Sequence, residues 1–144
     1  MLFSKTKPVL IVGCGRFGAS LAGTINSRDY EVTVIDKDKA AFSKLPGNFG
    51  GYEIAADGSD ITILEDAGIK DAEIVIAATG SDCTNSLVCQ IASRIFHVHN
   101  VYMRLEDPVM ERVVSGYGMR VIYPFRLSMR EFERLSGIDL EEEV

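Results

Sequence analysis

Short runs of apolar, mostly β-branched residues alternate along the chain with longer segments in which apolar positions repeat at helical spacing. Most of these runs lack polar alternation, as is typical of strands that helices cover on both faces of a sheet. The alternation therefore predicts an α/β domain built from βαβ units around a parallel sheet. The six predicted strands span Val9 to Val12, Glu31 to Ile35, Tyr52 to Ala55, Glu73 to Ala77, Val101 to Met103 and Arg120 to Ile122.

The clearest helical pattern runs from Asp82 to Phe96. Apolar residues recur there at intervals of three and four, which predicts one stripe facing the sheet. Ser81 precedes the pattern and is a suitable N-cap. The predicted stripe comprises Leu87, Val88, Ile91, Ala92 and Ile95.

A second helix is predicted after Asp107, which would act as N-cap with Pro108 at the first helical position. Gly116 tolerates a left-handed terminal turn and predicts the end of this helix. The residues predicted to face the core are Val109, Val113 and Val114.

A glycine-rich motif follows the first predicted strand directly. Its sequence is Gly13-Cys14-Gly15-Arg16-Phe17-Gly18, and a helical pattern comes after it. This strand, loop and helix context is the one that a phosphate-binding G-x-G-x-x-G loop requires. Gly13 would allow the tight turn, Gly15 would let a pyrophosphate approach the backbone, and Gly18 would let the helix pack closely on the strand. Phosphates would then rest on unpaired N–H groups at the helix N-terminus.

A carboxylate, Asp36, ends the second predicted strand, eighteen residues after Gly18. This is close to the spacing of about 20 at which an acidic residue binds the ribose of a dinucleotide. Such a carboxylate accepts both ribose hydroxyls and repels a 2′-phosphate, so NAD, ATP, ADP or AMP are favoured over NADP. The alternative is that Asp36 is an exposed residue capping the next helix.

Two predicted strands end in similar small residues. Ile54 to Gly58 and Ile76 to Gly80 both read Ile-Ala-Ala-x-Gly and lie twenty-two residues apart. Ligands of open parallel sheets bind beyond the carboxyl ends of strands, where small residues let a ligand approach the backbone. Small residues also suit tight strand-to-helix turns, so both interpretations stay open.

Two residues of the glycine motif each have two interpretations. The guanidinium of Arg16 could pair with phosphate oxygens, or it could lie along the surface with its head in water. Cys14 could be a thiol of low pKa at a helix N-terminus, or it could simply be small enough to fit the loop.

No catalytic set accompanies the motif. His97 and His99 lie at the entry to the fifth predicted strand, at the opposite end from the expected nucleotide, and Cys89 is expected in the core. The three cysteines show no C-x-x-C spacing, which favours a reducing compartment and argues against a disulfide framework or a zinc site.

Composition and charge limit the number of domains and the classes of partner that the chain can have. The 144 residues suit one domain, and 47% of them are hydrophobic, which is enough for a core. Four of the twenty-one acids lie between Asp139 and Glu143, so the net charge of −6 leaves −2 for the remainder. A near-neutral body does not favour nucleic acid or anionic lipid as partners. The apolar runs are too short for a membrane span, and the first seven residues do not predict a signal peptide.

These features together resemble the N-lobe of regulator-of-potassium-conductance domains, the RCK or KTN domains of Trk- and Ktr-type potassium uptake systems. The resemblance runs from about Val9 to Leu135. It rests on Val12 to Gly18, Asp36-Lys37, Asp57-Gly58, Ala78-Thr79 and Val101 to Arg104.

The resemblance implies a Rossmann-like, doubly wound six-stranded parallel sheet of order 3-2-1-4-5-6, with helices on both faces and a C-terminal crossover helix. The N-lobe would span residues 1–136, with the crossover helix from about residue 127 to Leu135. An acidic tail would follow at 137–144, and no C-lobe is expected in this chain. In the family the corresponding helix crosses to a partner subunit; the alternative is a helix docked on its own domain.

The resemblance also implies a function: a cytoplasmic, non-enzymatic subunit that binds NAD(H) or ATP, ADP or AMP and gates an integral-membrane potassium-translocating partner. Such subunits form dimers, which can assemble into a ring. By this resemblance Arg16 would meet the phosphates, Asp36 and Lys37 the ribose, and Asp57 and Gly58 the adenine side. The whole expected site comprises Gly13, Cys14, Gly15, Arg16, Phe17, Gly18, Asp36, Lys37, Asp57, Gly58, Ala78, Thr79, Gly80 and Arg104.

One departure from the family concerns metal binding. Phe125 follows Pro124, where relatives often carry a glutamate used for cation binding, so no metal site is expected. Two alternative functions stay open at this point. One is the cofactor-binding half of an NAD-dependent oxidoreductase, and the other is a redox-sensing NADH module that uses Cys14.

Overall fold

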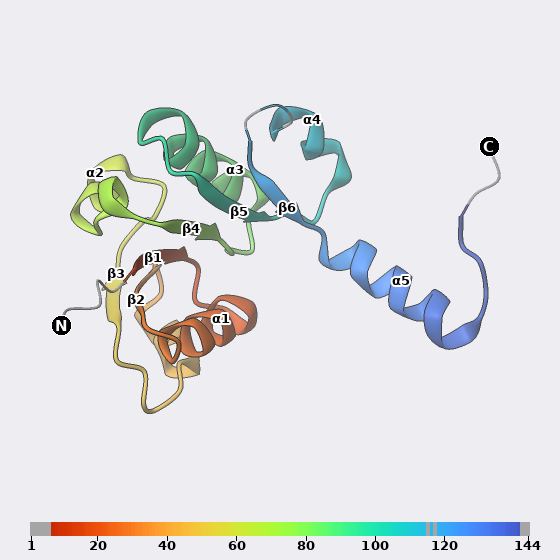
Figure 1. Ribbon diagram of the computed structural model, residues 1–144, viewed down its shortest axis with the longest axis horizontal. Coiled ribbons are helices and arrows are strands. Elements are labelled where there is room, and N and C mark those ends of the chain that lie inside the picture. The colour runs from red at the N-terminus through yellow and green to blue at the C-terminus, as the bar shows by residue number, and fades with distance from the viewer. Residues whose placement is uncertain (1–6, 115, 117, 142–144) are drawn as a thin grey trace.

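The computed structural model describes residues 7–114, 116 and 118–141. They form a parallel sheet flanked by helices, with a terminal helix that projects from the sheet domain (Figure 1). The strands are β1 (Lys7–Val12), β2 (Tyr30–Asp36), β3 (Tyr52–Ala55), β4 (Ile74–Ala77), β5 (Asn100–Arg104) and β6 (Arg120–Ile122). The α-helices are α1 (Arg16–Asn26), α2 (Ile61–Asp66), α3 (Asp82–Gln90), α4 (Glu111–Val114) and α5 (Pro124–Ser136). Shorter helical turns are η1 (Lys39–Lys44), η2 (Ile69–Asp71), η3 (Ile91–Ile95) and η4 (Pro108–Met110).

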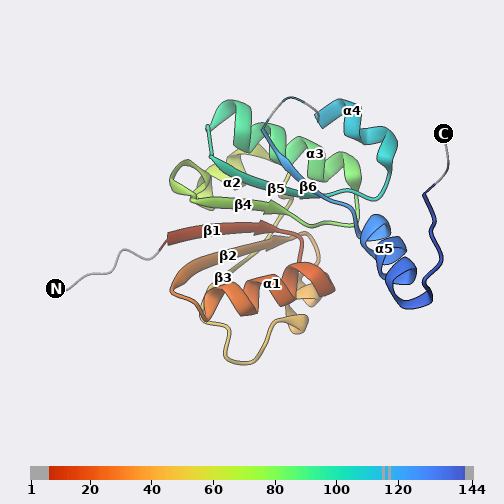
Figure 2. The ribbon, with the colours of Figure 1, turned by 45° about the vertical axis from the view of Figure 1, so that its right-hand side comes forward.

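All six predicted strands are present, and the predicted strand order is confirmed. The sheet runs β3-β2-β1-β4-β5-β6, and each neighbouring pair is parallel. Helix α1 lies on one face of the sheet, and α2 and α3 lie on the other (Figure 2). The direction of winding reverses between β1 and β4, which places a topological switch point at the carboxyl end of β1.

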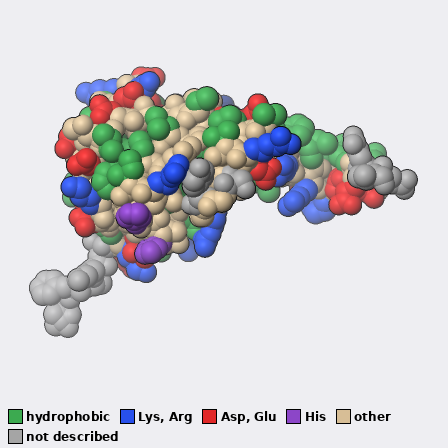
Figure 3. Space-filling model, turned by 90° about the horizontal axis from the view of Figure 1, so that it is seen from above, with side chains coloured by type: hydrophobic (Ala, Val, Ile, Leu, Met, Phe, Trp, Pro, Cys, Tyr) green, Lys and Arg blue, Asp and Glu red, His purple; other side chains and the backbone are tan. Residues whose placement is uncertain are grey.

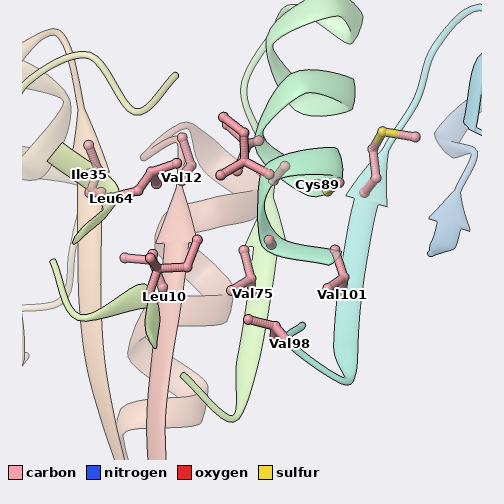
Figure 4. Packing of buried hydrophobic residues seen from close by; sticks show 14 of the residues in the cluster. Leu10, Val12, Ile35, Leu64, Val75, Cys89, Val98 and Val101 are labelled. Carbon is pink, nitrogen blue, oxygen red and sulfur yellow. The ribbon is translucent and has the colours of Figure 1, made fainter. Parts of the chain in front are cut away.

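The core has two layers because successive side chains of a strand point to opposite faces of the sheet. On β1, Leu10 and Val12 pack toward α2 and α3 (Figure 4), whereas Val9 and Ile11 pack toward α1. All four side chains are at most 2% exposed. Burial on both faces explains why the strand sequences are continuously apolar.

The helix after β4 differs in part from its predicted stripe. Ser81 caps α3, and its hydroxyl oxygen accepts a hydrogen bond from the Thr84 N–H at 3.2 Å. The α-helix ends at Gln90 and continues as the π-helical turn η3. Val88, Ile91 and Ala92 are buried as predicted, but Leu87 and Ile95 are exposed. The face toward the sheet is instead formed by Asn85, Val88, Cys89 and Ala92, which recur at helical spacing.

The segment after β5 also begins as predicted and then departs from the prediction. Asp107 accepts a hydrogen bond from the Val109 N–H at 3.0 Å, and Pro108 is the first helical residue. The first turn is a 3₁₀ turn, η4, and α4 follows it. Val114 is 3% exposed, but Val109 and Val113 are 74% and 49% exposed, so two of the three predicted core residues are wrong. The tighter turn alters the side-chain phase, and Met110 packs on the core instead. Gly116 has φ +88°, as expected for a left-handed turn.

Helix α5 begins at Pro124, before the predicted start near residue 127, and ends at Gly137 with φ +73°. None of its side chains is buried, and it projects away from the sheet (Figures 1 and 2). It therefore does not dock on its own domain, contrary to one of the two interpretations. The part of the predicted acidic tail from Glu142 onward lies outside the described residues. No helix in the described part of the chain has the length and apolarity to span a membrane.

Candidate nucleotide-binding site

A cavity of about 490 Å³ lies beyond the carboxyl ends of β1, β2, β3, β4 and β5. It occupies the switch point of the sheet, where ligands of such folds bind. Eleven of the fourteen predicted site residues line it, namely Gly13, Cys14, Gly15, Asp36, Lys37, Asp57, Gly58, Ala78, Thr79, Gly80 and Arg104. Arg16, Phe17 and Gly18 do not. The lining also includes Val12, Ile35, Asp38, Ala41, Lys44, Ser81 and Thr84, which are not among the predicted site residues.

Two glycines of the loop are required by its geometry. Gly13 has φ +108°, and a Cβ there would lie 2.7 Å from backbone atoms of Ala78 and Thr79. A Cβ on Gly18 would overlap the carbonyl oxygen of Gly13. Gly15 has ordinary φ of −77°, and a Cβ on it would meet nothing within 4 Å. The loop therefore matches the roles predicted for its turn and its packing, and it leaves open space beside Gly15.

Asp36 fixes the glycine loop to the segment that follows β2. Its Oδ2 accepts a hydrogen bond from the Cys14 N–H at 2.8 Å, and its Oδ1 accepts one from the Asp38 N–H at 2.8 Å. The cap of η1 is Asp38, which accepts a hydrogen bond from the Ala40 N–H at 3.0 Å. Asp36 is therefore not simply a helix cap. A carboxylate offers about four acceptor positions, so this one keeps capacity for ribose hydroxyls.

The opposite wall of the cavity is held by a buried amide. Asn85 on α3 accepts hydrogen bonds from the N–H and the hydroxyl of Thr79, at 2.9 and 2.6 Å. It donates to the carbonyl oxygens of Thr79 and Arg104, at 3.0 and 2.9 Å. The ends of β4 and β5 are thereby joined through one side chain. Sequence reasoning missed Asn85, although it lies three residues before Val88 and so falls on the face of α3 that packs on the sheet.

Asp82, the first residue of α3, also binds backbone beyond the end of β5. Its carboxylate accepts hydrogen bonds from the N–H groups of Glu106 and Asp107, both at 2.9 Å. The segment that follows Arg104 is therefore fixed to the N-terminus of α3. This fixes the backbone from which the Arg104 side chain reaches the cavity.

The charged side chains of the cavity are partly paired within the protein. Lys37 lies 3.7 Å from Asp57, and Arg104 Nη2 lies 2.8 Å from Glu106. Hydrogen bonds from Ser59, together with Lys37, lower the pKa of Asp57. Arg104 Nε is buried and has no partner among the described residues. Lys37 and Arg104 both line the cavity, so the residues present fit an anionic ligand.

Two predicted chemical roles change once the geometry is known. Cys14 is fully buried, and burial together with the negative charge of Asp36 raises the pKa of its thiol. This contradicts the hypothesis of a reactive, low-pKa thiol and supports a small residue that fits the loop. Arg16 is the first residue of α1 and is exposed outside the cavity lining, as its surface interpretation predicts. Cys89 is buried in the core as expected.

The histidines lie far from the cavity along the sheet. His97 and His99 line a separate hollow at the entry to β5, as predicted. They are visible on the surface at the end of the sheet domain away from α5 (Figure 3). No group of three metal-ligating side chains occurs within residues 7–114, 116 and 118–141.

The parallel sheet of order 3-2-1-4-5-6, with a glycine loop after β1 and a cavity over the strand ends, defines a Rossmann-like domain. More narrowly, the chain belongs to the TrkA-N domain family, which matches it over residues 9–124. This match confirms the family that the sequence resembles.

Curated relatives carry names from potassium uptake. The chain is 33% identical over 118 residues to the Trk system potassium uptake protein TrkA of Streptomyces coelicolor, covering 82% of this chain and 53% of that protein. It is 32% identical over 128 residues to a TrkA homolog of Methanothermobacter thermautotrophicus, covering 88% and 59%. The chain thus spans little more than half the length of these relatives.

Solved structures support the fold. The TrkA-N domain of the inner membrane protein ybaL from Escherichia coli has a TM-score of 0.80 and 18% identity, covering 96% of this chain and 100% of that chain. The GsuK channel bound to NAD has a TM-score of 0.72 and 18% identity, covering 92% and 24%. GsuK bound to ADP has a TM-score of 0.71 and 18% identity, covering 92% and 35%. The Rossmann-like fold is confirmed.

Proposed function

We propose that this protein is a non-enzymatic regulatory subunit that binds NAD(H) or an adenine nucleotide and controls a potassium-translocating membrane partner. The observation that carries the proposal is the cavity at the switch point, which gathers the glycine loop, Asp36 and Arg104. The names of the curated relatives support the potassium system, and the NAD and ADP bound to GsuK support the ligand class.

The proposed ligand is held by complementary groups along the cavity. Asp36 and Lys37 would hold the adenosine ribose, and Asp57 and Gly58 would lie on the adenine side. The phosphates would lie near Gly15, at the positive end of the α1 dipole. Ala78, Thr79, Gly80 and Arg104 would close the remaining side. None of these roles requires chemistry on the ligand, since binding alone can shift a conformational equilibrium when one conformation is bound better.

The subunit would lie on the cytoplasmic side of the membrane and act as a homodimer, and further dimers would complete a ring. The dimer is supported by α5, on which Phe125, Met129, Phe132 and Leu135 are large and exposed. Apolar side chains arranged on a helix without an intramolecular partner fit a second subunit.

The first test is calorimetric titration with ATP, ADP, AMP, NAD and NADH. We expect saturable binding of at least one of these, with affinity reduced at least about tenfold by Asp36→Ala because two charge-assisted ribose contacts are lost. Arg16→Ala would change the affinity of the isolated domain less than twofold, since Arg16 lies outside the cavity lining. Failure of every nucleotide to bind would refute the proposal. Hydride transfer by the protein above the Asp36→Ala background would favour the oxidoreductase class instead.

A further inference from the structure

Three cationic side chains line the nucleotide cavity, and they differ in whether the protein neutralises them. Lys37 is paired with Asp57, and the guanidinium of Arg104 is paired with Glu106. Lys44 also lines the cavity, and no carboxylate of the described residues lies within ion-pair distance of its ammonium. Its positive charge is therefore available to a ligand.

The backbone that carries Lys44 is well fixed. Lys44 is the last residue of η1, whose Ala41 and Phe42 are buried against the α1 face of the sheet. Asp36 accepts a hydrogen bond from the Asp38 N–H, and Asp38 caps η1 in turn. The same Asp36 carboxylate accepts a hydrogen bond from the Cys14 N–H. The base of the Lys44 side chain is thus held relative to the glycine loop by one carboxylate.

The topology places Lys44 and Arg104 on opposite sides of the glycine loop. Lys44 follows β2, which lies beside β1 on one side, and Arg104 ends β5, which lies beyond β4 on the other. Lys44 shares the cavity lining with Cys14 and Gly15, and its charge acts on the Cys14 thiol by lowering its pKa against the larger effect of burial. A phosphate at the loop would therefore lie between Arg104, whose guanidinium is paired with Glu106, and Lys44, whose ammonium has no carboxylate partner in the described part of the chain.

We propose that Lys44 is the residue of this subunit that pairs with the 5′-phosphate group of the bound adenine nucleotide. Because the proposal assumes that such a nucleotide occupies the cavity, it rests on the function proposed above. It assigns to Lys44 the phosphate role that the sequence suggested for Arg16, which is exposed outside the cavity. Lys44 would make the affinity for ADP, AMP and NAD exceed that for adenosine.

The test compares Lys44→Gln with Lys39→Gln by calorimetric titration with ADP, 5′-AMP, 2′-AMP, NAD and adenosine. Lys39 begins the same turn η1 but does not line the cavity, so it controls for loss of surface charge. We expect Lys44→Gln to weaken ADP, 5′-AMP and NAD about tenfold, as loss of a charge-assisted hydrogen bond predicts. Lys44→Arg would retain most of the affinity, and adenosine would bind equally well to all variants.

A second measurement uses salt. The affinity of the wild type for ADP would fall as NaCl is raised, and this dependence would be shallower in Lys44→Gln. Lys44 is exposed, so we expect its substitution to leave the thermal unfolding temperature unchanged.

Three outcomes would overturn the proposal, and a fourth would refute the function on which it rests. An ADP affinity of Lys44→Gln equal to that of Lys39→Gln would overturn it, as would an equal loss of adenosine affinity. Selective loss of 2′-AMP would assign Lys44 to the ribose 2′ position and would also overturn it. Failure of the wild type to bind any of these nucleotides would instead refute the proposed function itself.

Discussion

The glycine-loop end of the sheet and helix α5 are stabilised in opposite ways. At the loop, Gly18 packs so closely on Gly13 that no Cβ fits, and the buried Asn85 side chain uses both the oxygen and the nitrogen of its amide to bind the backbone of Thr79 and Arg104. On α5 no side chain is buried, and large apolar residues face outward. The first region is complete within one chain, whereas the second leaves apolar surface for another molecule. Substitutions should therefore affect folding in the loop and association in α5.

The substitution expected to destabilise the glycine loop most is Gly18→Ala. The added methyl would overlap the Gly13 carbonyl, and neither backbone can move freely because Gly13 is itself fixed against Ala78. We expect a loss of about 3 kcal/mol in the free energy of unfolding, or failure to fold. Urea denaturation followed by circular dichroism measures this loss.

The matched control is Gly15→Ala, three residues earlier in the same motif. A Cβ at Gly15 meets nothing within 4 Å, and its φ of −77° suits alanine. Its unfolding free energy should stay within about 1 kcal/mol of the wild type. Equal destabilisation by both substitutions would mean that the close packing at Gly18 is not what the loop depends on.

The next largest loss of stability is expected at Asn85, whose side-chain amide joins the ends of β4 and β5 in the cavity wall. Asn85→Ala removes an acceptor from the Thr79 N–H and a donor from the Arg104 carbonyl. We expect a cost of about 2 to 4 kcal/mol in urea denaturation, since partly buried backbone groups of Thr79 and Arg104 are left without partners. Asn48→Ala, at an exposed asparagine, should change stability by less than about 0.5 kcal/mol. Similar small effects for both would show that water replaces the Asn85 amide.

The sequence predicted the sheet better than it predicted the helices. The inner strands β1, β2 and β4 have buried side chains on both faces, so their apolar runs stand out without knowledge of neighbours. The edge strands β3 and β6 contain no buried residue and were found from their place in the βαβ alternation. The exposure of Ile95 and Val109 could not be predicted, since they lie in a π-helical turn and a 3₁₀ turn, which shift side-chain phase without any change in hydrophobic pattern.

The residues of the candidate site also differ in whether the sequence could predict them. The glycine loop and Asp36 are predictable because they are local motifs with fixed spacing. Asn85 and Lys44 are distant in sequence from that motif, and their positions depend on tertiary packing of α3 and η1. Arg16 lies inside the motif, but its placement at the first position of α1 directs it outside the cavity.

A substitution on helix α5 should change the association of subunits and leave the unfolding free energy unchanged, which is the reverse of a substitution in the glycine loop. In the proposed dimer, Phe132→Ser would remove an apolar contact between subunits and shift the protein toward monomer at micromolar concentration, as measured by sedimentation velocity. Within the monomer Phe132 is half exposed, so the unfolding free energy of the sheet domain should change by less than about 0.5 kcal/mol. Arg130→Ala is the control, because residues two apart face different sides of a helix. A wild type that is monomeric at these concentrations would argue against the dimer.

The smallest perturbation is chemical labelling of the three thiols, which compares buried with exposed cysteines in the native protein. Cys14 in the loop and Cys89 in the core are buried, whereas Cys83 on α3 is exposed. Burial raises the pKa of Cys14 and raises that of Cys89 to about 12, so both stay protonated at pH 8. Because the thiolate is the reactive form, iodoacetamide should modify Cys83 alone in the native protein and all three thiols in urea, as counted by mass spectrometry. Modification of Cys14 at a rate close to that of Cys83 would mean that the glycine loop opens in solution, and it would restore the redox-sensing hypothesis for that thiol. Protection of Cys14 would instead show that the loop is as closed as its glycine packing requires.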